Sequence, residues 1–371
     1  MSLNFIKPDF PRGEYNALFP DLKRIPKKFK LYTRMSLLTF DYIMSKVSGP
    51  LTKNWCNLHD SPILQEERFV ITLRFLVTGN SYSALSFSFK IGISTVSGII
   101  LECLDVLWNI FTPIHMPVPT ESDFVKISNE FFCKWGVPNC IGSIDGKHVR
   151  IKKPAHSGTL FYNYKNYFSS VLQATVDANG KFIMIEIYKY GSQSDGAIFY
   201  KSKLVMNIHQ RKLKIPTLKK LPWSEEKLPY YFIGDGAYPL REYLMKPMRG
   251  QRLTTQESNY NYRLSRARCV VENSFGRISK KWEVLQKTIQ QKPENVEKVI
   301  KGICILHNIL IDKNDKTLMN DVKYVNEQEV QEDKQQRYDS QQFQHQRLAQ
   351  KGAQSRSRLM EWFAKYPLHN G

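Results

Sequence analysis

The sequence predicts an α/β core preceded by an all-α region, and three segments carry this prediction. Two short apolar runs, IGSIDG around Asp145 and YYFIGDG around Asp235, each end in Asp-Gly. A short apolar run bounded by turn residues is typical of a buried strand. The third segment has helical periodicity and contains Glu272. If the two strands are parallel neighbours that stop at their Asp-Gly pairs, both aspartates lie at one edge of a mixed sheet flanked by helices.

The charge balance points to a polyanionic partner. Lys and Arg number 54 against 34 Asp and Glu, which gives a net charge of +20 and a pI near 9.5. A surplus of this size favours nucleic acid as the partner. A soluble protein that is merely basic is the alternative. The 371 residues, 42% of them hydrophobic, suffice for two packed domains.

Cysteine spacing and hydropathy argue against several classes of protein. None of the six cysteines forms a Cys-x-x-Cys pair, so a zinc site is not expected. The first residues lack a basic start followed by an apolar core, and no run approaches the ~18 apolar residues of a membrane span. We therefore expect an intracellular protein with reduced thiols and no membrane partner.

Composition divides the chain into four regions. Residues 1–35 form a basic extension, either a nuclear-localisation or phosphate-contacting segment or a solvated lead-in. Residues 36–120 have helical patterns, and residues 138–311 carry the three acidic segments. Residues 312–371 are polar and are expected to be mobile, apart from an apolar patch at 359–363 that docks back on the core.

The helical region has the layout of a helix-turn-helix. A short helix over 81–89, a turn containing Gly92 and a third helix capped by Ser94 follow one another, and a proline-rich linker begins near Pro113. An ordinary helical hairpin fits the same pattern. The third helix begins Ser-Thr-Val-Ser without a base-reading Arg or Asn, so we expect it to read bases weakly.

Within the core region the pattern predicts two adjacent strands and a closing helix. The strands are expected over 169–177 and 181–190, joined by an Ala-Asn-Gly turn. A helix opens near Asp195, and an apolar helix over 299–310 ends the region.

The Glu272 helix presents an apolar stripe with small residues beside it. Glu272 lies one residue off the stripe, and its neighbours Ser265, Gly276 and Ser279 leave room for a metal ion and a substrate strand. Carboxylates suit Mg²⁺, and two ions about 4 Å apart can activate water and stabilise the leaving oxygen of a phosphodiester. The nearby basic residues are the predicted DNA contacts: Arg263, Arg266, Arg268, Lys280 and Lys281.

Each acid taken alone has a simpler interpretation. An aspartate before glycine is commonly a turn residue, and a helix glutamate is commonly a surface residue. The prediction of a metal site depends on the three acids together, in this order of elements.

In its motifs the chain resembles the Harbinger-type (PIF/Harbinger) transposases of the DDE superfamily and their host-domesticated relatives. The resemblance extends over roughly residues 40–311. The matching segments are GSIDGKH at 142–148, GSQSDG at 191–196, GDGAYPL at 234–240, NYRLSRAR at 261–268 running into VENSFG at 271–276, and LHN at 306–308.

The resemblance implies an RNase H-like fold in which Asp145, Asp235 and Glu272 are the metal-binding catalytic triad. Asp195 is an accessory candidate for which a helix cap is the favoured interpretation. His148 is a second accessory candidate, more often a strand residue near such a site than a ligand.

The resemblance also implies a function and a setting. The expected activity is that of a metal-dependent DNA endonuclease or transposase, using two divalent ions such as Mg²⁺ and able to perform strand transfer. We expect a nuclear location, with the cytoplasm also open, and a separate Myb-like DNA-binding partner protein; homo-oligomerisation is left open. The rival is a non-catalytic DNA- or chromatin-binding adaptor on the same fold.

Overall fold

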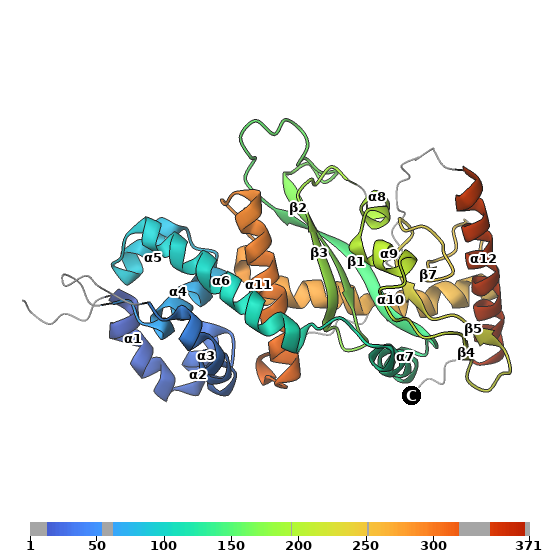
Figure 1. Ribbon diagram of the computed structural model, residues 1–371, viewed down its shortest axis with the longest axis horizontal. Helices are drawn as coiled ribbons and strands as arrows, with labels where there is room; N and C mark the ends of the chain where they lie inside the picture. Colours follow the sequence, from blue (N-terminus) through green and yellow to red (C-terminus); the bar gives the residue numbers. More distant parts are fainter. Residues whose placement is uncertain (1–12, 54–61, 194, 251, 319–341, 368–371) are drawn as a thin grey trace, which may run out of the picture. The chain divides into compact units, whose positions relative to one another are not determined.

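A computed structural model (Figure 1) describes residues 13–53, 62–193, 195–250, 252–318 and 342–367. The chain divides into a helical unit, Met1–His115 with Ile278–Met319, and a sheet unit, Met116–Arg277 with Asn320–Gly371. Each unit therefore draws on two separate stretches of sequence.

The helical unit begins earlier in the chain than the composition suggested. The rings of Phe19, Phe29 and Phe40 pack with centroids 5.4 to 5.8 Å apart. The expectation that residues 1–35 form an extension is therefore wrong from Gly13 onward, because these rings are buried while the lysines of the second helix stay exposed. The elements of this unit are α1 (Gly13–Arg24), α2 (Pro26–Thr33), α3 (Leu37–Leu51), α4 (Gln65–Thr78), α5 (Tyr82–Phe89), α6 (Ile93–His115) and α11 (Pro293–Asp312), with the 3₁₀ turns η1 (Glu283–Leu285) and η2 (Lys316–Leu318).

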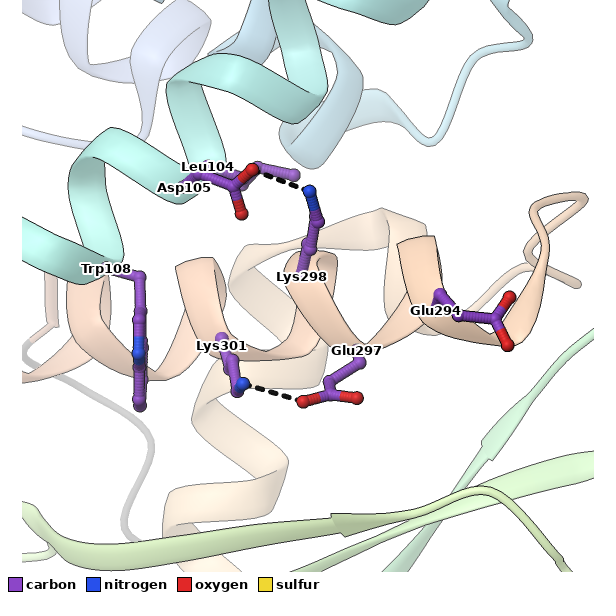
Figure 2. Close-up of a pocket in the computed structure, with 7 residues that line it drawn as sticks. All are labelled: Leu104, Asp105, Trp108, Glu294, Glu297, Lys298 and Lys301. Atoms are coloured by element: carbon purple, nitrogen blue, oxygen red, sulfur yellow. Dashed lines mark hydrogen bonds and ion pairs between the residues drawn. The ribbon is translucent and has the colours of Figure 1, made fainter.

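α11 belongs to the helical unit, although we expected residues 299–310 to close the core region. It packs along α6, and Figure 2 shows Lys298 of α11 reaching Asp105 of α6 at 2.6 Å. The helices approach closely at Gly302, where a Cβ would lie 2.4 Å from Leu104 Cδ2. Apolar periodicity predicted the helix correctly but could not say which core it completes.

α6 runs through Pro113 to His115, where the sequence predicted a linker. α11 holds this last turn, because His115 Nδ1 lies 2.6 Å from Asp312 Oδ2 and Asn308 donates to the His115 carbonyl at 2.9 Å. By length and composition α6 could also cross a membrane. Its buried residues, such as Ile100, pack against α4 and α11 as in the central helix of a helical domain.

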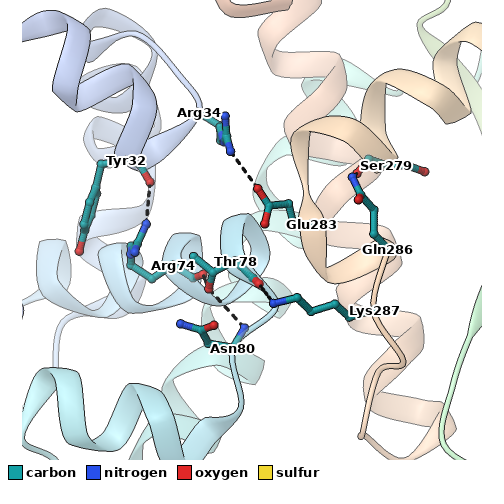
Figure 3. Close-up of polar contacts among 9 residues, drawn as sticks. All are labelled: Tyr32, Arg34, Arg74, Thr78, Asn80, Ser279, Glu283, Gln286 and Lys287. Atoms are coloured by element: carbon teal, nitrogen blue, oxygen red, sulfur yellow. Dashed lines mark hydrogen bonds and ion pairs between the residues drawn. The ribbon is translucent and has the colours of Figure 1, made fainter.

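The α4–α5–α6 segment has the layout expected of a helix-turn-helix, with α5 ending at Lys90 in the left-handed region. Figure 3 shows how residues in and after η1 hold α4 and the end of α2. Lys287 Nζ donates to the Thr78 carbonyl at 2.5 Å, and Arg34 pairs with Glu283 at 3.0 Å. Such contacts suit any helical domain, so the helix-turn-helix role of this segment and the weak base reading expected of α6 stay predictions.

The sheet unit contains a five-stranded mixed sheet in the order β3-β2-β1-β6-β7. β1 is antiparallel to β2, β2 is antiparallel to β3, and β1, β6 and β7 run parallel. The predicted α/β core and its parallel pair of Asp-Gly strands are confirmed. The strands are β1 (Cys140–Arg150), β2 (Ser169–Val176), β3 (Phe182–Tyr188), β6 (Tyr231–Ile233) and β7 (Leu244–Met245), with a separate ribbon of β4 (Lys219–Lys220) and β5 (Lys227–Leu228).

Helices flank this sheet. The helices are α7 (Glu121–Trp135), α8 (Asp195–Tyr200), α9 (Lys203–His209), α10 (Thr255–Lys281) and α12 (Gln342–Lys365), and the last turn of α10, from Ile278, is assigned to the helical unit. Two of their phenylalanines, Phe124 of α7 and Phe199 of α8, are buried in one hydrophobic core. The strand residues Ile141 and Phe232, together with Tyr238, belong to the same core.

The sequence suggested that β1 stops at its Asp-Gly pair, but the strand continues beyond it. It continues to Arg150 because β2 pairs with it throughout, with Asp145 opposite Ala174. A strand can continue through turn-forming residues where a neighbouring strand satisfies its backbone hydrogen bonds. β6, by contrast, ends at Ile233, before its Asp-Gly pair.

α12 belongs to the sheet unit, so the tail is not polar and mobile throughout. Leu359 and Phe363 are fully buried, and Trp362 Nε1 donates to the Pro222 carbonyl at 2.9 Å. This confirms that the apolar patch docks back on the core. Of the remaining tail, residues 319–341 lie outside the described part of the chain.

Candidate active site

Asp145 and Asp235 occupy equivalent positions on neighbouring parallel strands. Ser143 of β1 pairs with Ile233 of β6, and each aspartate follows two residues further on. Neighbouring strands lie about 4.8 Å apart, so this register brings the two carboxylates to one edge of the parallel pair. Both residues are partly exposed, and each carboxylate accepts a backbone N–H from one or two residues further along, at 2.8 and 3.0 Å.

Two glycines permit this close pairing. A Cβ at Gly142 would lie 2.7 Å from Thr175 Cγ2, and one at Gly234 would lie 2.9 Å from the Tyr238 ring. Since real Cβ contacts are essentially never this short, a side chain at either position would displace the neighbouring elements. Glycine at 142 and at 234 is therefore a packing requirement.

Glu272 reaches the same region from α10. One turn earlier the helix is fixed to β1, where Ser143 Oγ donates to the Arg268 carbonyl at 3.4 Å. The Glu272 side chain is 40% exposed, and a Cβ at Gly276 would meet nothing within 4 Å. The open space that the small residues predicted beside Glu272 is present at Gly276.

Arg268 lies within electrostatic reach of all three acids. Its Nη1 is 2.6 Å from Glu272 Oε1. Burial lowers the pKa of this guanidinium, but the negative charges of Glu272, Asp145 and Asp235 outweigh it, and the pKa is raised overall. In this conformation Arg268 balances the acids, whereas the sequence predicted that it contacts DNA.

The three carboxylates are chemically suited to a divalent ion, but in this structure Glu272 is ion-paired with Arg268. Three carboxylates are the hard oxygen ligands that Mg²⁺ prefers, and they already accommodate one cation. Within the described ranges, however, no three His, Cys, Asp or Glu side chains converge closely enough to hold an ion. Ion binding would require Arg268 to release Glu272.

Comparison with known proteins identifies the family. A family profile described as DDE superfamily endonuclease matches residues 144–308, a range that includes Asp145, Asp235 and Glu272. The chain is also 30% identical over 300 residues to the Arabidopsis thaliana protein named Protein ALP1-like, an alignment that covers 79% of this chain and 73% of that protein. The chain belongs to the DDE superfamily of endonucleases.

Two further relatives support the same family. The Arabidopsis thaliana protein named Antagonist of Like Heterochromatin Protein 1 is 25% identical over 294 residues, covering 77% of this chain and 74% of its own. The Bos taurus protein named "Putative nuclease HARBI1" is 24% identical over 254 residues, covering 67% and 68%. The ALP1-like and HARBI1 proteins derive from Harbinger transposases, so the resemblance found in the motifs is confirmed. No solved structure matches the chain significantly, but its five-stranded mixed sheet flanked by helices agrees with a DDE nuclease core.

Of the two accessory candidates, His148 does not join the three acids. Strand alternation places His148 on the face of β1 opposite to Asp145, and its Nδ1 lies 2.9 Å from Ser169 Oγ. Burial, helped by two neighbouring lysines, lowers the pKa of His148 to about 4, so the ring is neutral at neutral pH. α8 begins at Asp195, whose side chain lies outside the described atoms.

Two of the five predicted DNA contacts are buried. Arg263 is 1% exposed, donates to a tail carbonyl and lies over the Phe363 ring. Lys281 is 9% exposed and donates to Thr317 Oγ1 at 2.7 Å. The structure contradicts phosphate contacts by these two residues, because both lie on the inward side of α10. Arg266 and Lys280 remain accessible, and Arg268 is partly exposed but engaged with Glu272.

A basic group beside Asp235 was not predicted from the sequence. Lys246 and Arg249 both donate to the Gly236 carbonyl, Lys246 at 3.2 Å. Burial, together with the charges of Arg249 and Arg356, lowers the pKa of Lys246 to about 8. No motif marks these residues; the only signal was their place shortly after the second Asp-Gly pair.

Proposed function

We propose that this protein is a metal-dependent DNA endonuclease of the transposase type. The observation that carries the proposal is the equivalent placement of Asp145 and Asp235 on parallel strands, with Glu272 linked to them through Arg268. The net charge of +20 supports DNA as the substrate. The bovine relative is named a nuclease, which supports the same reaction class.

In the proposed mechanism the three acids hold the ions and basic residues hold the DNA. Divalent ions, when bound, supply an activated water and stabilise the leaving oxygen of the phosphodiester. The carboxylates of Asp145, Asp235 and Glu272 would hold them. Arg268, once released from Glu272, binds a phosphate oxygen, because a guanidinium pairs well with phosphate. In strand transfer a DNA 3′-hydroxyl takes the place of water.

The proposed setting follows from the family and from what the chain lacks. We assign Mg²⁺ as the cofactor and the nucleus as the location. A separate Myb-like protein supplies sequence-specific contacts, since α6 begins without a base-reading Arg or Asn.

Nicking of supercoiled plasmid by the purified full chain tests the activity. We expect nicked product with Mg²⁺ and none with EDTA. Asp145→Asn should keep the fold, measured by circular dichroism, and abolish nicking, because the amide keeps the shape and loses the charge that holds an ion. Nicking by a folded Asp145→Asn protein at the wild-type rate would refute the assignment.

A second function is favoured by one specific observation. Arg268 pairs with Glu272 in the conformation described, and a permanent pair of this kind would make the chain a non-catalytic DNA- or chromatin-binding adaptor. The name of the second Arabidopsis relative refers to heterochromatin protein, which agrees with such a role. DNA binding without Mg²⁺-dependent nicking, unchanged by Asp145→Asn, would favour the adaptor.

A further inference from the structure

A cationic pocket lies on the sheet unit, and none of the three acids lines it. Its volume is about 340 Å³, and no carboxylate lines it. The end of α7, the β2–β3 turn and α10 form its walls (the elements are labelled in Figure 1). Its polar and aromatic lining residues are Lys134, Trp135, Asn179, Arg266, Asn273 and Arg277.

The pocket and the acidic site use different sides of α10. Arg266, Asn273 and Arg277 are spaced by seven and four residues, so they share one side of the helix. Glu272 precedes Asn273 by one residue and therefore projects about 100° away from it around the helix. A ligand in the pocket would thus not occupy the space beside Glu272.

Arg277 is poorly satisfied by the protein itself. Its Nε is buried without a hydrogen-bond partner. Across the ranges that the structure describes, neither Arg277 nor Arg266 has an ion pair or hydrogen bond to a side chain. Burial lowers the pKa of Arg277, which is the expected cost of a half-buried cation without a counter-ion. A planar guanidinium in this condition suits a phosphate, which can accept two parallel hydrogen bonds.

The opposite wall is held in place from both sides. Ser274 Oγ donates to the Gly180 carbonyl at 2.9 Å, and Gly180 has a φ of 81°, which favours glycine. Trp135 Nε1 donates to the Ala178 carbonyl at 3.0 Å. The β2–β3 turn is therefore fixed against α10 and α7, and the pocket is built before any ligand arrives.

Two acids beside the pocket are already engaged outside the lining. Asp177 accepts hydrogen bonds from the Asn179 and Lys181 N–H groups, at 2.8 and 2.9 Å. Glu130 of α7 accepts a hydrogen bond from Asn179 Nδ2 at 2.6 Å, and Asn179 Oδ1 accepts one from Lys134. The three cations leave the pocket with a local positive charge that an anion would balance.

We propose that this pocket binds a phosphate group of a nucleic-acid backbone, at a site separate from the carboxylates. Arg266 and Arg277 contact the phosphate oxygens, and Lys134 adds charge at the rim. The choice of DNA as the source of phosphate rests on the proposed function. The binding of a phosphate group by the pocket does not rest on the proposed function, because its cations need neither a metal ion nor catalysis to attract an anion.

The test is binding of the full chain to a fluorescent DNA duplex by anisotropy, in EDTA, over a salt series. Arg266→Gln and Arg277→Gln should each weaken binding severalfold and lower the slope of log affinity against log salt by about 0.9, the value for one lost phosphate contact. Lys212→Gln, which removes an exposed charge elsewhere on the sheet unit, is the matched control and should have a smaller effect. Thermal melts confirm that each variant is folded.

Two results would overturn the proposal. Affinity and slope unchanged in both arginine variants would remove the pocket from the DNA surface. Arginine variants that lose binding of pyrophosphate but keep binding of DNA would instead identify a site for free phosphates. Because the assay contains EDTA, a failure here is distinct from a failure to cleave DNA, which concerns only the carboxylates.

Discussion

Arg268 is the residue on which the state of the three acids depends. It pairs with Glu272, and Asp145 and Asp235 also raise its pKa against the effect of burial. Without it, the three carboxylates would repel one another. We expect Arg268→Gln to lower the melting temperature in EDTA by about 2–4 °C, the shift for ~1 kcal/mol in a domain of ~150–250 residues.

The same variant should respond more strongly to Mg²⁺. An ion no longer competes with the guanidinium for Glu272, so Mg²⁺ should raise the melting temperature of Arg268→Gln more than that of the wild type. Lys212→Gln is the control for loss of a positive charge. An equal Mg²⁺ shift in Arg268→Gln and the wild type would show that Arg268 does not occupy the place of an ion.

Two glycines near the acids should respond oppositely to alanine. Gly142→Ala places a methyl group 2.7 Å from Thr175 Cγ2, and overpacking of this kind costs about 1–3 kcal/mol. Gly276→Ala enters open space on a helix and should stabilise by up to ~1 kcal/mol. Urea unfolding of both variants measures the difference. A Gly142→Ala protein as stable as the wild type would mean that β1 adjusts without strain.

At the scale of elements, Asp315 fastens η2 to α3. Its Oδ2 accepts hydrogen bonds from Ser36 N–H, Ser36 Oγ and Thr39 Oγ1, at 2.9, 2.7 and 2.5 Å. Burial raises the pKa of this carboxyl, but the hydrogen bonds outweigh burial and hold the pKa well below its usual range. Sequence composition had assigned this residue to a polar tail.

This depressed pKa predicts an acid-dependent stability. Because the folded-state value lies below the unfolded value of ~3.9, the stabilisation is complete above that pH and is lost as the pH falls through the folded-state pKa. We expect Asp315→Asn to cost ~2 kcal/mol at neutral pH, with the difference from wild type narrowing below pH ~4. Asp41→Asn, an exposed change on α3, is the control. A difference that stays constant down to pH ~2 would contradict this account.

The elements that the sequence predicted well have local signals. β2, β3 and β6 are short apolar runs between turn residues, and the α10 periodicity was clear from Leu264 to Ile278. The end of β1 was predicted wrongly, because the Asp145 turn signal is local while β2 pairing is not. Likewise the Arg268–Glu272 pair follows from helical spacing, whereas the basic group at Lys246 depends on folding of the segment after β7.

At the scale of the whole molecule, the sequence order hides the two units. Composition suggested consecutive regions, 36–120, 138–311 and 312–371. The helical unit instead includes Ile278–Met319, and the sheet unit includes the docked α12. A compositional boundary cannot show that a later segment completes an earlier core, because that depends on which apolar faces meet in space. This error did not affect the prediction of the three acidic motifs, because each motif is local to one strand or helix.

The charge of the whole molecule predicts how it binds DNA. With a net charge of +20 and no base-reading Arg or Asn at the start of α6, we expect phosphate contacts with little sequence preference. Log affinity should fall linearly with log salt, by about 0.9 per phosphate neutralised. The two lysines at the end of α10 differ in exposure: Lys280 is exposed, whereas Lys281 is buried and bonded to Thr317.

Alanine at these two positions should therefore act on different quantities. Lys280→Ala should lower the salt slope by up to about 0.9 and lower the melting temperature less than Lys281→Ala does. Lys281→Ala should leave the slope unchanged and lower the melting temperature, because the side chain is buried and its Nζ is bonded to Thr317. The measurement is anisotropy against many unrelated duplexes across a salt series. Strong preference for one duplex with a shallow slope would show that this chain reads bases itself and needs no separate DNA-binding partner.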